Sequence, residues 1–104
     1  MTFKAAFIFI APEVDLKTTQ HEFLTPGISL MAAGVSTYDE AVKLAVELVK
    51  NGVGAIELCA GFGHEGVAKV TKAVHAINSD VKVGVVRFDS HPGFDYKSGD
   101  ELFQ

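Results

Sequence analysis

The fold is decided by the stretch Ala55-Ile56-Glu57-Leu58-Cys59-Ala60-Gly61-Phe62-Gly63-His64-Glu65-Gly66. Its first half is mostly apolar, as in a buried strand, and its glycines are spaced as in G-x-G-x-x-G. Glycines at this spacing let the backbone approach a ligand closely, and a helix that begins there points free N–H groups at the ligand. The stretch therefore predicts a strand, a glycine turn and a helix, with a candidate site at the turn.

The rest of the chain repeats this alternation. Apolar runs predict strands at 4–11, 28–35, 54–60 and 81–88. Apolar residues at helical spacing predict helices from a capping box at Thr37 and Glu40 to Asn51, and over 65–78. Residues 13–25 are ambiguous, because Asp15 could cap a helix there that has few apolar contacts. Residues 89–104 form a polar and aromatic tail, in which a short helix could start at Ser98 or Asp100.

Strands that alternate with helices predict an α/β fold in one domain over residues 1–104. We expect a small, mainly parallel, four-stranded sheet with right-handed βαβ crossovers. The expected strand order is 2-1-3-4, and a sequential half-barrel order is the alternative. In the order 2-1-3-4 both firm helices cover one face, so Phe7, Phe9, Leu30 and Ala32 need another cover. A second chain is the simplest one, and we therefore expect a homo-oligomer, with the aromatic tail as the other candidate cover.

Composition excludes several classes of partner. The chain has 104 residues, of which 48% are hydrophobic and 21% charged, and its formal net charge is -4. Its nine Lys and Arg are scattered, which argues against nucleic acid. The apolar run before Pro12 is too short for a membrane span or a signal peptide. The single Cys59 excludes an internal disulfide and suits a cytoplasmic protein.

Because ligands bind beyond the carboxyl ends of parallel strands, the glycine turn and the end of the fourth strand are expected to meet at one edge. There the sequence predicts an anion site, with His64 as acid or base and Glu57 or Asp89 as the carboxylate that orients it. The ligand-binding residues would be Gly61, Gly63, Glu65, Gly66, Arg87 and His91. The alternative is that the glycines only make a tight turn and let the helix pack closely.

Other chemistry fits these residues less well. The order of strand, glycine turn, helix and Asp89 is close to a dinucleotide fingerprint, but Glu65 would repel a pyrophosphate. His64, Glu65, Asp89 and His91 could supply metal ligands, yet they lack a recognised ligand spacing, so no metal site is predicted. Glu57 and Arg87 could also form a purely structural salt bridge. No cofactor can be named from the sequence.

Four segments carry a resemblance to a known family: 4–12, 55–69, 84–89 and 97–103. They resemble a family of small bacterial proteins catalogued as a domain of unknown function. The resemblance implies a single compact α/β domain and supplies no activity or ligand. The central turn also resembles, at the level of fold alone, the phosphate-gripping turns of β/α barrel enzymes.

The sequence leaves three hypotheses about function. The first is an enzyme that acts on a small anionic metabolite at the glycine turn. The second is a non-catalytic module that binds or senses a small molecule in the same place. The third is a structural oligomer without a ligand.

Overall fold

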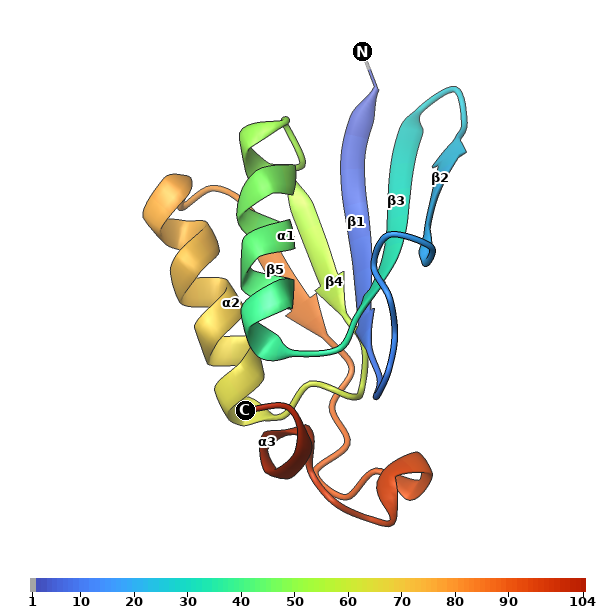
Figure 1. Cartoon of the computed structure of the whole chain (residues 1–104). Helices are drawn as coiled ribbons and strands as arrows, with labels where there is room; N and C mark the ends of the chain where they lie inside the picture. Colours follow the sequence, from blue (N-terminus) through green and yellow to red (C-terminus); the bar gives the residue numbers. More distant parts are fainter. Residues whose placement is uncertain (1) are drawn as a thin grey trace.

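A computed structural model describes residues 2–104, and Figure 1 shows its strands and helices. The strands are β1 (Phe3–Ile10), β2 (Gln20–Leu24), β3 (Ile28–Val35), β4 (Ala55–Leu58) and β5 (Lys82–Val85). The helices are α1 (Tyr38–Lys50), α2 (His64–Ile77) and α3 (Gly99–Leu102), with a 3-10 turn, η1 (Pro92–Phe94). The strands form one sheet in the order β2-β3-β1-β4-β5.

The sheet is mixed. β3, β1, β4 and β5 are parallel neighbours, and β2 pairs with β3 in the antiparallel sense. The four expected strands correspond to β1, β3, β4 and β5, and among themselves they keep the expected order, β3-β1-β4-β5. The prediction of four strands was wrong, because β2 adds a fifth strand at the edge. The sequential half-barrel order was also wrong, since β1 lies between β3 and β4.

β2 forms where a helix had been considered. Asp15 caps a turn instead, as its carboxylate accepts from the Lys17 amide at 3.0 Å. The chain then reverses at 25–27, and Phe23 faces Leu30 across the hairpin. The segment has too few apolar residues for a buried helical stripe, whereas pairing with β3 satisfies its backbone directly.

The two long helices follow their sequence signals closely. Thr37 caps α1 by accepting from the Glu40 amide at 3.1 Å. The Glu40 carboxylate accepts from the Ser36 amide at 2.9 Å, one residue earlier than a capping box requires. After the helix, Gly52 has a φ of 97°, the left-handed conformation that glycine adopts without strain.

α1 and α2 lie on the same side of the sheet (Figure 1). The core fills the space between them and the sheet, where Ile8, Leu58, Val70 and Val74 are fully buried. The apolar stripe expected over 65–78 includes Ile77, and this position is wrong, because Ile77 is exposed in the last turn of α2. Among residues 2–104, no helix covers the other face of the sheet.

The C-terminal tail closes the carboxyl edge of the sheet. Phe103 is buried, and its ring centroid lies 6.2 Å from that of Tyr38 and 5.4 Å from that of Phe94. α3 therefore sits beside the start of α2, as Figure 1 shows. The two buried or half-buried aromatic residues of the tail join the helical layer, so the tail is not the cover of the bare face.

Among residues 2–104, the longest helix has 14 residues, and none is both long and apolar enough to cross a bilayer.

Candidate functional site

The glycine turn that follows β4 is filled by the chain itself. Gly63 is the N-cap of α2 and offers no side chain to the free amides of the first turn. Asp100 takes that role from α3, because its carboxylate accepts from the Glu65 amide at 3.0 Å and from the Gly66 amide at 3.2 Å. A carboxylate at a helix N-terminus is favoured by both the amides and the dipole.

Tyr38 completes this arrangement from the start of α1. Its hydroxyl donates to Asp100 Oδ1 at 2.8 Å and accepts from the Gly63 amide at 3.0 Å. A Cβ added to Gly66 would overlap the Tyr38 ring, and one added to Gly63 would overlap the Asp100 carboxyl. These glycines therefore allow close packing of α1, α2 and α3.

Both polar groups of this contact titrate away from their ordinary range. Burial raises the pKa of the Tyr38 hydroxyl, although the Gly63 amide opposes that shift, and the Asp100 charge adds to it. Burial alone would raise the pKa of Asp100, but the amides of Glu65 and Gly66 and the Tyr38 hydroxyl together lower it. At neutral pH the pair is thus an ionised Asp100 and a neutral Tyr38.

A second polar cluster lies beside the turn. Arg87, just beyond β5, places NH1 at 2.6 Å from His64 Nδ1 and NH2 against Asp89 Oδ1. His64 Nε2 lies 3.2 Å from the same Asp89 oxygen. The side chains of His64 and Asp89 are 73% and 76% exposed, whereas that of Arg87 is only 26% exposed. The cluster is thus a partly buried cation under two exposed groups.

The tautomer of His64 follows from these contacts. A guanidinium only donates hydrogen bonds, so Nδ1 of His64 must accept from Arg87 and carries no proton. The proton then resides on Nε2, which lies 3.2 Å from Asp89 Oδ1. Because the Nδ1 lone pair accepts from Arg87, His64 has no free lone pair for a substrate in this arrangement.

One donor of Arg87 is unsatisfied. Its Nε is buried and has no hydrogen-bond partner among residues 2–104. A buried donor without a partner costs about 1–3 kcal/mol. Such groups in native structures call for an explanation, and a ligand or an ordered water is the usual one.

The remaining predicted site residues lie elsewhere. Glu57 pairs in register with Gly84, which puts its side chain on the bare face and Arg87 on the opposite side. The expected Glu57–Arg87 salt bridge is therefore wrong, and Glu57 is too far around the sheet to orient His64. The His91 ring stacks on Phe94 at 4.3 Å, and its Nδ1 accepts from the Gly93 amide.

The thiol and the acidic residues form no metal centre. Cys59 Sγ accepts from the Ile10 and Gly61 amides at 3.4 and 3.3 Å. Across residues 2–104, no three His, Cys, Asp or Glu side chains gather closely enough to hold an ion.

The comparisons with known proteins give a family and no activity. Residues 3–101 match a family described as Family of unknown function (DUF6506). The chain belongs to this family. The DUF6506 match confirms the expected resemblance to a family of unknown function, and no curated protein or solved structure matches significantly.

In this DUF6506 chain, the sequence reasoning missed Tyr38 and Asp100. Tyr38 is an apolar position at the start of α1 by its spacing, and the spacing alone predicts only burial. Asp100 had a detectable signal, because Ser98 and Glu101 form the capping box of α3 and place Asp100 in its first turn. The contact between Asp100 and Glu65 joins residues that are 35 positions apart, so no local sequence signal predicts it.

Proposed function

We propose that this chain binds a small anionic metabolite, either a carboxylate or a phosphate ester, at the cluster of His64, Arg87 and Asp89. The observation that carries the proposal is Arg87, a cation with a side chain only 26% exposed and a buried, unpaired Nε at the carboxyl edge of the sheet. Such a cation is costly for stability. This edge is also where parallel α/β sheets bind ligands.

The chemistry of the cluster suits an exchange of anions. A guanidinium binds a carboxylate or a phosphate through two parallel hydrogen bonds. In the free protein the Asp89 carboxylate stands where such a ligand group would bind. Because Asp89 is 76% exposed, it can turn away at low cost and leave NH2 to the ligand.

Binding accounts for the geometry better than catalysis does. The Nδ1 lone pair of His64 accepts from Arg87, so His64 can position Arg87 but cannot act as a base as it stands. Catalysis remains a second hypothesis, favoured by the contact between His64 and Asp89, since a bound anion that draws Arg87 away would free Nδ1. Turnover of p-nitrophenyl acetate or p-nitrophenyl phosphate by the wild type, lost in His64→Gln, would support it.

The proposal is tested by isothermal titration calorimetry with inorganic phosphate and with succinate. We expect at least one of them to bind the wild type with a Kd of about 1 mM, as suits an open site. Arg87→Ala should abolish this binding. The matched control is Lys69→Ala, which removes an exposed positive charge from α2 but not from the cluster.

Asp89→Asn distinguishes anion exchange from simple attraction. Removing the internal competitor should tighten binding by about threefold to tenfold, equivalent to about 1 kcal/mol for an exposed ion pair. Equal binding by the wild type and Arg87→Ala, or no binding of either anion by the wild type, would overturn the proposal.

A further inference from the structure

The face of the sheet opposite α1 and α2 is apolar and uncovered by any helix. We call it the open face. The strand register places on it these residues of the described chain: Phe3, Ala5, Phe7, Phe9, His21, Phe23, Ile28, Leu30, Ala32, Gly34, Ala55, Glu57, Lys82 and Gly84. Phe23 is 50% exposed and Ile28 is 44% exposed. Contiguous apolar surface of this kind on a folded chain marks an interaction site.

The described chain covers only one end of the open face. Val14 packs over Gly34, where its Cγ1 would lie 2.8 Å from an added Cβ. The C-terminal tail packs against Tyr38 and the start of α2, on the other side of the sheet. The central and amino-terminal parts of the face therefore need a partner from outside the chain.

The two charged residues of the open face favour a second copy as that partner. The whole chain carries a net charge of -4, so two copies repel one another elsewhere, and a pairing face must avoid adding to this repulsion. The open face as described has one carboxylate, Glu57, and one ammonium, Lys82. In a two-fold pair of such faces, Glu57 of one copy can meet Lys82 of the other, and each charge keeps an opposite partner.

The relief of the face is also self-complementary. Small side chains leave a hollow of about 310 Å³ around Ala5, Ala55 and Gly84. A second hollow of about 310 Å³ lies beside Phe9 and Ala32. Phe7, which is half-buried in the single chain, lies between them on β1, so the face offers both a partly exposed aromatic ring and hollows that could receive one.

The area is adequate for a specific dimer. Strands about 4.8 Å apart with about 3.3 Å per residue give a five-stranded face of about 24 by 20 Å. The accessible surface exceeds this footprint of about 500 Å² because side chains project from it. Specific interfaces begin at about 600 Å² for each partner. We propose that two copies of this chain pair face to face through the open face, with Phe7 of each copy entering a hollow of the other.

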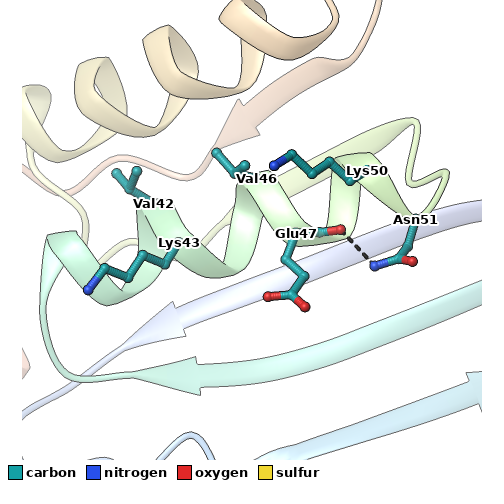
Figure 2. A pocket seen from close by; sticks show the side chains of 6 residues that line it. All are labelled: Val42, Lys43, Val46, Glu47, Lys50 and Asn51. Atoms are coloured by element: carbon teal, nitrogen blue, oxygen red, sulfur yellow. Dashed lines mark hydrogen bonds between the residues drawn. The ribbon is translucent and has the colours of Figure 1, made fainter.

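The hollow along α1 does not compete as an interface. It has a volume of about 630 Å³ and is lined only by that helix and its C-cap, Asn51, so it has a single wall. Figure 2 shows Val42 and Val46 there among Lys43, Glu47 and Lys50, with the Asn51 amide donating to the Glu47 carbonyl at 2.9 Å. Its mixture of charges matches a solvated helix surface.

Two neighbouring residues of β2 give a matched test. Phe23 pairs with Leu30 on the open face, whereas Leu24 pairs with Ser29 and points to the other side. Both are exposed in the single chain, at 50% and 73%. We expect gel filtration with light scattering to give the wild type twice the chain mass of 11.1 kDa. Phe23→Lys should give the mass of one chain, and Leu24→Lys should stay double.

Several results would overturn the proposal. The first is a single-chain mass for the wild type at about 100 µM, a concentration at which interfaces of this size associate. The second is a Phe23→Lys variant that stays dimeric. The third is equal dissociation of the Phe23→Lys and Leu24→Lys dimers. If Phe23→Lys does not fold, hydroxyl-radical footprinting of the wild type replaces it. Oxidation of Phe23 should then fall at least twofold as concentration rises, while that of Tyr96, which is 71% exposed in the tail, stays constant. Parallel behaviour of the two residues would reject the open face.

Discussion

Asp100 determines what the start of α2 can bind. The glycine turn was expected to offer the amides from Gly63 to Gly66 to an external anion. In the structure the Glu65 and Gly66 amides are taken by Asp100, and the Gly63 amide by the Tyr38 hydroxyl. The anion at the start of α2 is therefore a side chain of the same chain. The group that we propose for an outside ligand is Arg87.

Asp100→Asn should destabilise the fold at neutral pH. The lowered pKa means that the folded state prefers the ionised carboxylate, so its contribution is complete above the ordinary aspartate pKa of about 3.9. It is lost as the pH falls through the lower, folded-state pKa. Hydrogen bonds to a charged group contribute about 1.5–3 kcal/mol. Urea unfolding should show a difference of this size between wild type and variant at pH 7, shrinking toward zero below pH ~3.

An identical difference at pH 7 and at low pH would contradict this role for the charge. Glu101→Gln is a suitable control, because it removes a nearby acid of α3 that does not contact α2. Its carboxylate accepts from the Ser98 amide at 2.9 Å, within α3 and its cap.

The residues of the polar cluster share one property. His64, Arg87 and Asp89 each follow the carboxyl end of a parallel strand, and such ends meet at one edge whatever the details of register. Glu57 was misplaced because its side depends on register, and a shift of one residue moves a side chain to the opposite face. Asp100 was missed because its partners are distant in sequence.

Among the elements, α2 depends on its glycines for contact with α1. Gly66 lies in the first turn of α2, where the Tyr38 ring of α1 passes so closely that no Cβ fits. Helix signals predicted both helices, because caps and apolar spacing are local. β2 was not predicted because a short, polar segment gives similar local signals for an edge strand and for a marginal helix.

Gly66→Ala should therefore lower the free energy of unfolding. Overpacking at a fixed contact costs about 1–3 kcal/mol. Gly27→Ala is the matched control, since nothing lies within 4 Å of its added Cβ. That control should be neutral or slightly stabilising. Thermal or urea unfolding of both variants measures the difference, and equal effects would refute the packing role of Gly66.

At the scale of the whole molecule, connection handedness sets the layout. Both long helices follow strands and cross in the same direction, so they cover one face and leave the other open. The prediction of one covered face followed from topology alone. What the open face binds could not follow from topology, since it depends on the side chains that the register brings together.

The same layout separates two surfaces. The cluster of His64, Arg87 and Asp89 lies at the carboxyl edge on the helical side, while Glu57 and Lys82 lie on the open face. Ligand binding and pairing of chains are therefore independent in their tests: Arg87→Ala should keep the paired mass, and Phe23→Lys should keep phosphate binding. Loss of both properties in either variant would contradict this separation.

We propose that an external anion binds at Arg87 and not at the glycine turn. A crystal structure with tungstate, an oxyanion whose metal is located by anomalous scattering, tests this most directly. We expect the ion within hydrogen-bond distance of the Arg87 guanidinium, with Asp89 turned away and Asp100 still bound to the Glu65 and Gly66 amides. Tungstate on those two amides, with Asp100 displaced, would contradict it.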